Sequence, residues 1–239
     1  MKHINTTATQ VRKIKSAAKR LKLEKKILLA EALDLASIEA GYENYHHVSQ
    51  CVTQTIKLAP FSLGDLIAVS ETYIGKKTIL FRTKDNSYLD DERLLDITES
   101  LDELVEDVGG GFGDMSLISK PGLREIIKEC KKLTKLEPAF LDGYAHWAGA
   151  LVALNKHEES IAMALPVFNA CCELVPKGHL VVYYHLENRP FHRLAFNLAL
   201  AYEECDNYEA SRAIAKKMLS LWPNDNMGFR ELLEPPESP

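Results

Sequence analysis

The sequence predicts a mainly α-helical protein that carries a small β-hairpin near its middle. Apolar residues recur at helical spacing through most of the chain, and residues 189–225 show the pattern of two helices joined by a short polar turn. A β-prone stretch at residues 65–82 is interrupted by the turn-like sequence YIGKK. We expect a basic helical domain at 1–56, a mixed segment at 57–114, a helical domain at 115–233 and a disordered tail at 234–239.

Composition narrows the class of protein. The 239 residues are 46% hydrophobic and 26% charged, which is typical of a soluble globular protein. The formal net charge of −5 provides no general attraction to nucleic acids or anionic membranes. The apolar runs are too short to span a bilayer, and the N-terminus lacks the apolar core of a secretory signal. Five scattered cysteines without a CxxC pair indicate reduced thiols, so we expect a cytoplasmic protein with no membrane partner.

The first predicted helix, at residues 11–26, is basic and amphipathic. It holds eight basic residues and one acid, with an apolar stripe made of Val11, Ile14, Ala18 and Leu21. The simpler interpretation is a solvated face on a packed helix. The alternative is a surface for nucleic acid, formed by Lys15, Lys19, Arg20 and Lys22.

A second helix is expected after residue 27, with its apolar positions at Leu28, Ala32, Leu35 and Ala36. Gly41 is placed to end it, and Asn44 is placed to cap a short third helix. About forty residues here resemble a small helical domain at the N-termini of some bacterial proteins, including glyoxalase-superfamily members. His46 and His47 are adjacent and project differently from a helix, which disfavours a metal site.

The same stretch does not fit a helix-turn-helix motif. In the usual spacing of that motif, a small residue and an aliphatic residue would stand where this chain has Ser37 and His47. Ala36 and Val48 each miss those places by one position. We therefore keep nucleic-acid binding as the alternative function rather than the first.

The middle segment predicts a hairpin followed by an acidic helix. Strands are expected at residues 65–70 and 78–82. Residues 85–107 hold ten acids and one base, and their apolar face comprises Leu94, Leu95, Ile97, Leu101, Leu104 and Val105. The glycine-rich residues 109–114 lack a following GK[ST] sequence, so we interpret them as a connector between the halves and not as a phosphate loop.

Three further helical stretches follow. One begins at Ser119–Pro121 and ends before Pro138, with a buried side at Leu123, Ile126, Ile127, Cys130 and Leu133. From residue 139 a helical hairpin is expected, and Pro166 should kink its second helix. The hairpin at 189–225 has apolar positions at Leu194, Leu198, Ala201 and Tyr202, a break at Asp206–Asn207, and an end at Trp222–Pro223.

This last hairpin resembles a tetratricopeptide repeat. Its matching residues are Asn197, Leu198, Ala199, Tyr202, Asp206, Tyr208, Ser211 and Pro223. The hairpin from residue 139 resembles the same repeat at Tyr144, Trp147, Ala148, Leu151 and Ser160. The ENRP sequence at 187–190 and PNDN at 223–226 are similar to sequences in some uncharacterised tetratricopeptide-like proteins.

The resemblance implies an irregular α-solenoid with a partner-binding groove and no catalysis. Ser160 and Ser211 are 51 residues apart because the sequence GHLVVYYHLENRP is inserted between the hairpins. The groove would be lined by the first helices, at Asp142, Ala145, Gly149, Val152, Arg193, Phe196, Leu200 and Glu203. No ligand follows from the resemblance.

The insertion concentrates aromatic, amide and cationic side chains, which are common anchors of protein interfaces. The predicted partner-binding residues are Tyr183, Tyr184, Asn188, Arg189, His192, Arg193, Phe196, Asn197 and Leu200. The alternative, left open, is that the tyrosines fill the core and Arg189 ties down a helix end.

The predicted function is therefore a non-enzymatic scaffold that binds another protein or peptide. No GxSxG, HExxH or paired CxxC occurs, and the histidines are dispersed, so we expect no enzyme, no cofactor and no metal. Nucleic-acid binding through the basic helix is the alternative. The sequence does not set the oligomeric state.

Overall fold

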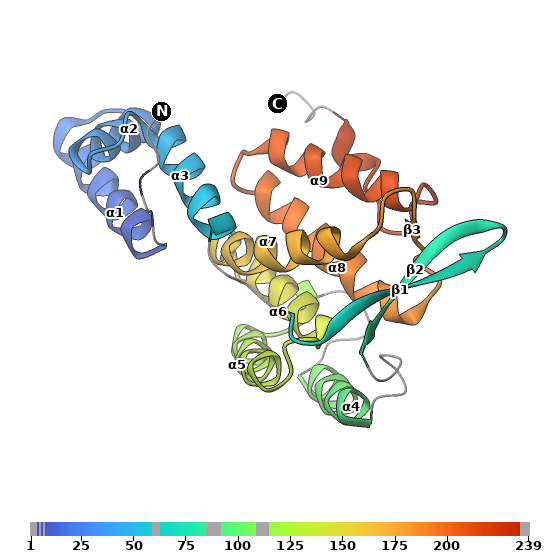
Figure 1. Ribbon diagram of the computed structural model, residues 1–239. Helices are drawn as coiled ribbons and strands as arrows, with labels where there is room; N and C mark the ends of the chain where they lie inside the picture. Colours follow the sequence, from blue (N-terminus) through green and yellow to red (C-terminus); the bar gives the residue numbers. More distant parts are fainter. Residues whose placement is uncertain are drawn as a thin grey trace. The chain divides into compact units, whose positions relative to one another are not determined.

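The computed structural model describes Ile4, Thr6 and residues 8–58, 63–84, 92–108 and 115–234, without the side chains of 8, 9, 12, 52–58 and 92–97. The chain forms two compact units, Met1–Pro60 and Phe61–Pro239 (Figure 1). The segments predicted at 57–114 and 115–233 thus lie almost wholly in one unit. The expected glycine-rich connector at 109–114 and the tail beyond residue 234 lie outside the described residues.

The first unit contains α1 (Ala8–Lys25), α2 (Leu29–Glu39) and α3 (Tyr45–Leu58). The predicted stripe on α1 is confirmed, because its apolar residues form a core with α2 and α3 that contains Val11, Ile14, Ala18, Ala32, Ala36, Tyr42, Val48 and Cys51. Leu28 was expected on the buried face of α2. It instead precedes that helix in an extended conformation and is 76% exposed.

The turn between α2 and α3 follows the predicted signals. Gly41 has a φ of +91° just after α2 ends. The Asn44 carboxamide oxygen accepts a hydrogen bond from the His47 backbone N–H at 2.8 Å, so Asn44 caps α3 as expected. His47 is buried, and its Nδ1 accepts from the Glu43 N–H at 3.1 Å. This histidine therefore holds the turn together.

The second unit begins with the predicted hairpin. β1 (Leu66–Tyr73) pairs antiparallel with β2 (Lys76–Thr83), and a short β3 (Leu180–Val181) pairs parallel with β2. The sheet order is β1-β2-β3. Both strands of the hairpin are longer than the sequence predicted. The loop between them has only two residues, because Tyr73 pairs with Lys76.

Helices make up the rest of this unit. They are α4 (Glu92–Asp107), α5 (Lys120–Leu136), α6 (Leu141–Ala153), α7 (His157–Leu174), α8 (Arg189–Glu203) and α9 (Tyr208–Leu221), with short 3-10 turns η1 (Met115–Leu117), η2 (Leu186–Asn188) and η3 (Glu231–Leu233). Among these, α6 packs against α5, α7 and α8, and α8 packs against α6, α7 and α9. The fold is thus mainly helical with a small sheet, as predicted.

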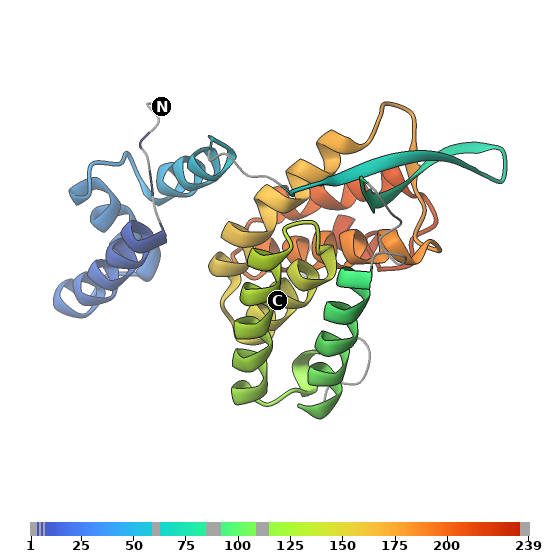
Figure 2. The same ribbon diagram turned by 60° about the horizontal axis from the view of Figure 1, so that its bottom comes forward.

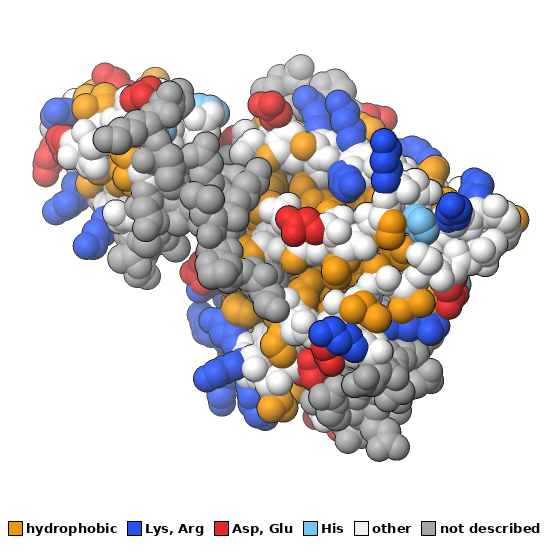
Figure 3. Space-filling view, viewed as in Figure 1, with side chains coloured by type: hydrophobic (Ala, Val, Ile, Leu, Met, Phe, Trp, Pro, Cys, Tyr) orange, Lys and Arg blue, Asp and Glu red, His pale blue; other side chains and the backbone are white. Residues whose placement is uncertain are grey.

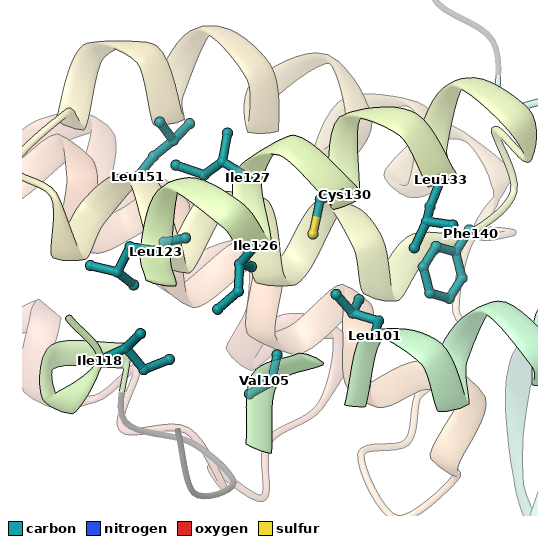
Figure 4. Close-up of a cluster of buried hydrophobic side chains, with 11 residues drawn as sticks. Leu101, Val105, Ile118, Leu123, Ile126, Ile127, Cys130, Leu133, Phe140 and Leu151 are labelled. Atoms are coloured by element: carbon teal, nitrogen blue, oxygen red, sulfur yellow. The ribbon is translucent and has the colours of Figure 1, made fainter. Parts of the chain in front are cut away.

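The acidic helix is packed into the unit through its apolar face. Leu101 and Val105 of α4 are buried against the predicted buried side of α5, and α4 runs beside α5 (Figure 2 and Figure 4). Ser119 caps α5, since its Oγ accepts from the Gly122 N–H at 3.3 Å. The predicted helix is confirmed at residues 92–107, and its predicted apolar face is confirmed at Leu101, Leu104 and Val105, whereas the side chains of Leu94, Leu95 and Ile97 lie outside the described part of the chain. Residues 85–91 lie outside the described part of the chain.

Small residues stand where the paired helices meet. Ser160 Oγ of α7 donates a hydrogen bond to the Ala148 carbonyl of α6 at 3.2 Å, and both residues are fully buried. Ala199 of α8 and Ser211 of α9 are fully buried in the same way. Pro166 lies inside α7, and the helix continues past it to Leu174.

The hairpin turn contains a strained apolar residue. Ile74 has a φ of +48° and Gly75 a φ of +70°, as a two-residue turn of this hand requires. A β-branched residue rarely adopts a positive φ, because its Cβ crowds the backbone. Ile74 is also 81% exposed, so packing within the chain does little to offset the strain.

We predict that Ile74→Asn makes the second unit more stable. Asn tolerates the left-handed conformation, so the free energy of unfolding should rise by about 1 kcal/mol. Urea unfolding followed by the fluorescence of Trp147 and Trp222 measures this change, since both tryptophans lie in the second unit. Ile74→Val keeps the β-branch and should change little. An Asn variant no more stable than the Val variant would contradict the assignment of strain.

Candidate functional site

The predicted partner-binding residues fall into three different environments. The first is a buried clip formed by Asn188. Its Oδ1 accepts from the Phe81 N–H at 3.2 Å, and its Nδ2 donates to the carbonyls of Ile79 at 2.9 Å and Val182 at 3.1 Å. The amide therefore ties β2 to the inserted loop and to the start of α8. Because Asn188 is fully buried, its role in this fold is structural and it does not reach a partner directly.

Two neighbours of Asn188 also fasten the loop. Arg189 Nε donates to the Tyr183 carbonyl at 3.4 Å, and the guanidinium lies over the Tyr183 ring at 5.6 Å. His192 Nε2 donates to the Val181 carbonyl at 2.9 Å. Arg189 thus ties the loop to the start of α8, which was one of the two interpretations left open by the sequence. His192 is buried and, like Asn188, faces the interior.

The second environment is an exposed aromatic and apolar surface at the end of the hairpin. The Tyr73 ring lies edge-on to His185 at 5.5 Å and to Trp222 at 6.4 Å, and Tyr184 packs edge-on to Trp222 at 5.9 Å. Tyr184 is nevertheless 53% exposed. We call this surface the tip patch, and it comprises Tyr73, Ile74 and Tyr184, with the buried Trp222 in contact with both tyrosines. Figure 1 shows the hairpin projecting beyond the helices of its unit.

The third environment is the predicted groove. Arg193 Nη2 donates to Asp142 Oδ1 at 2.7 Å, and Asn197 Nδ2 donates to the Ala145 carbonyl at 3.2 Å, so both side chains bind α6. Phe196 packs edge-on against Phe229 at 5.5 Å. Leu200 is half-buried.

The chain closes one end of this groove itself. Asp142, Ala145 and Gly149 were expected to be open to a partner, but all three are buried. A Cβ added at Gly149 would lie 3.4 Å from Met115 Cγ and 3.1 Å from Asn197 Nδ2. The prediction of an open groove at these residues is wrong, because η1 and α8 cover them. Val152 and Glu203 remain half-buried.

A partly buried polar cluster lies where α4, α6 and α8 meet. Besides Asp142 and Arg193 it contains Asp102 of α4 and His146 of α6, whose Nε2 is 3.7 Å from Asp142 Oδ1. One ligand atom from each of Asp102, Asp142 and His146 lies within 4.8 Å of the others. These are the only described residues that meet such a criterion for a metal-binding group.

Electrostatics in this cluster follow from burial. Burial, and then the nearby Asp142 carboxylate, raise the pKa of Asp102 above its usual value. Burial lowers the pKa of His146, which keeps the imidazole neutral near pH 7. The sequence analysis missed Asp102 and His146, since Asp102 belongs to a long acidic run and His146 to no motif. The spacing of Asp142 and His146 on one helical face was the only local signal.

Three of the five cysteines are poorly suited to act as nucleophiles. Cys51, Cys130 and Cys171 are buried, and all five thiols are free. Burial raises the pKa of Cys130 and Cys171, and it raises that of Cys172 to about 11. These three thiols are therefore protonated near neutral pH and unreactive.

The basic residues of α1 belong to the first unit, apart from the three environments described above. Lys19, Arg20 and Lys22 are exposed, whereas Lys15 is half-buried with its Nζ 5.9 Å from the centre of the Tyr45 ring. Residues 1–60 hold ten Lys and Arg against five Asp and Glu, so this unit carries a net charge of +5 and the remainder −10. Figure 3 shows the Lys and Arg side chains over α1.

Comparison with known protein families, curated proteins and solved structures finds no match to this chain. The resemblance to tetratricopeptide repeats therefore stays a prediction. Within the described ranges, no helix has the length and apolar character needed to cross a membrane.

We predict that acid destabilises the second unit through His192. Burial lowers the pKa of His192 from 6.5 to about 4, so the unfolded chain takes up the proton first as the pH falls. The free energy of unfolding should fall between pH 6.5 and 4, by up to about 3 kcal/mol from this residue. His146 adds to the same trend.

His192→Gln isolates this contribution. Glutamine retains an N–H for the Val181 carbonyl and does not titrate, so the variant should lose much of the pH dependence. Urea unfolding by tryptophan fluorescence at several pH values is the measurement. His46→Gln changes an exposed histidine of the first unit and serves as the control. Equal pH dependence in wild type and His192→Gln would show that burial of His192 does not set it.

Proposed function

We propose that this chain is a non-enzymatic protein-interaction module and that the tip patch is its binding surface. The observation that carries the proposal is Ile74, a β-branched residue with positive φ that is 81% exposed. Strain of this kind costs about 1–3 kcal/mol, and strained residues cluster at functional sites. A partner that buries the Ile74 side chain would supply the stabilisation that the chain itself does not.

The surroundings of Ile74 also support the proposal that the tip patch binds a partner. Tyr73, the neighbour of Ile74 in the chain, and the exposed Tyr184 both pack on Trp222, and large aromatic side chains are usual anchors of interfaces. These ring contacts hold both tyrosines in place, so little side-chain entropy would be lost on binding. The Asn188 clip holds the loop that carries Tyr184. The surface is thus preorganised.

The chemistry of the patch suggests the kind of partner. Its centre is apolar, and the exposed Lys76 and Lys77 follow the turn directly. A protein segment with apolar side chains flanked by Asp or Glu would complement both features.

We further propose that α6–α9 form the tetratricopeptide-like scaffold inferred from the sequence, because α8 packs against α6, α7 and α9 in the order that stacked hairpins require. A cytoplasmic location is part of this proposal.

We predict that a photo-crosslinking amino acid at position 74 captures a specific protein from the native lysate after nuclease treatment. The same amino acid at Leu136, which is also highly exposed but lies at the end of α5, is the matched control. Competition by unlabelled wild type should remove the product, whereas unlabelled Ile74→Asn should not. Since that substitution is expected to stabilise the fold, its failure to compete could not be ascribed to unfolding. Equal labelling from positions 74 and 136 would refute the tip patch as the interface.

Nucleic-acid binding by the first unit is the second candidate, favoured by its charge of +5. If Lys15, Lys19, Arg20 and Lys22 contact four phosphates, affinity for a DNA duplex should fall about 100-fold between 50 and 200 mM salt. Fluorescence anisotropy with a labelled duplex measures this. Lys19→Glu/Arg20→Glu should abolish binding, whereas Lys216→Glu/Lys217→Glu makes the same charge change on α9 and should not. Equal losses in the two variants would exclude a site on α1.

A further inference from the structure

The polar cluster of Asp102, Asp142, His146 and Arg193 brings two carboxylates and an imidazole together beside one guanidinium. Arg193 is committed to Asp142 through the 2.7 Å contact. Asp102 of α4 is half-buried and stands beside this pair. Two carboxylates next to an imidazole are a common ligand set for a metal cation.

His146 is the second, independent sign of a missing ligand. Its side chain is only 13% exposed. Both ring nitrogens are buried, and neither has a hydrogen-bond partner in the part of the chain that the structure describes. Buried imidazoles in proteins normally have such partners, because each unsatisfied polar atom costs about 1–3 kcal/mol. Nε2 is 3.7 Å from the Asp142 carboxylate, which is too far for a hydrogen bond.

The three side chains have the chemistry of a first-row metal site. A neutral imidazole nitrogen and carboxylate oxygens bind Zn²⁺ at about 2.0–2.2 Å, usually in tetrahedral geometry. Such bonds place neighbouring ligand atoms roughly 3.3–3.6 Å apart. The ligand atoms of Asp102, Asp142 and His146 already lie within 4.8 Å of one another, so small side-chain rotations bring them into range.

We propose that Asp102, Asp142 and His146 bind one Zn²⁺ ion, with the fourth position open to water. Arg193 would orient the Asp142 carboxylate through its hydrogen bond, as the partners of metal-ligating carboxylates commonly do. Mg²⁺ suits the site poorly, because it prefers six oxygen ligands in octahedral geometry.

A bound ion would have a structural effect, because its ligands come from two helices. Asp102 belongs to α4, whereas Asp142 and His146 belong to α6. Zn²⁺ would therefore join the acidic helix to α6 at the closed end of the predicted groove. The tip patch shares none of these residues, so this site and the proposed partner surface are separable.

Calorimetric titration of the full chain with ZnCl₂, after treatment with a chelator and dialysis, tests the proposal. Wild type should bind one more equivalent of Zn²⁺ than Asp102→Asn or His146→Gln, each of which should lose at least about 100-fold in affinity at this site. Asp107→Asn removes an exposed carboxylate from the same helix and should bind like wild type. MgCl₂ should give no comparable binding.

A readout on the wild-type chain covers the case in which a variant fails to fold. Long-range ¹H–¹⁵N spectra of the imidazoles should show Zn²⁺ shifting the ring nitrogens of His146 at one equivalent. Co²⁺ in place of Zn²⁺ should give the visible absorption of a tetrahedral site. Unchanged stoichiometry in Asp102→Asn and His146→Gln would overturn the assignment. So would shifts confined to other histidines, such as His46 and His47.

Discussion

The second unit depends on the side-chain amide of Asn188. Three hydrogen bonds from this one group join β2 to the inserted loop, and it lies immediately before α8. A buried amide must be paired, so the position of the hairpin, the path of the loop and the start of α8 are set together. Arg189 and His192 reinforce the same arrangement from the first turns of α8. The hairpin thus becomes a rigid arm of the helical unit.

The side chains of the inserted loop divide into buried ones, which hold the fold together, and exposed ones. Asn188 and His192 face inward, whereas Tyr184 and Leu186 of the same loop are exposed. The helical part of the unit shows a similar division between covered and exposed surface. The groove implied by the helical hairpins is closed at Asp142 and Gly149, because η1 and α8 cover these residues. The exposed tip patch lies at the hairpin, whereas the covered groove holds the polar cluster that we propose as a metal site.

Local signals in the sequence predicted most elements, because they act within a few residues. The α1 stripe, the cap at Asn44, the start of α5 after Ser119 and the hairpin around YIGKK each depend on near neighbours. The residues of the candidate site were harder to predict from the sequence. Asp102 and His146 meet only through tertiary packing, and the role of Asn188 depends on where β2 lies. The strain at Ile74 was implicit in YIGKK, since a two-residue loop of this hand needs positive φ at both residues.

The most direct test is amide hydrogen exchange in wild type and Asn188→Leu, which keeps similar volume and removes all three hydrogen bonds. If Asn188 holds the arm in place, exchange at the Phe81 amide and through β1 and β2 should accelerate by about 100-fold, corresponding to roughly 1 kcal/mol for each lost bond. Amides of the buried side of α5, such as that of Ile126, should keep most of their protection. Unchanged exchange at Phe81, or an equal loss in α5 and the hairpin, would contradict the account.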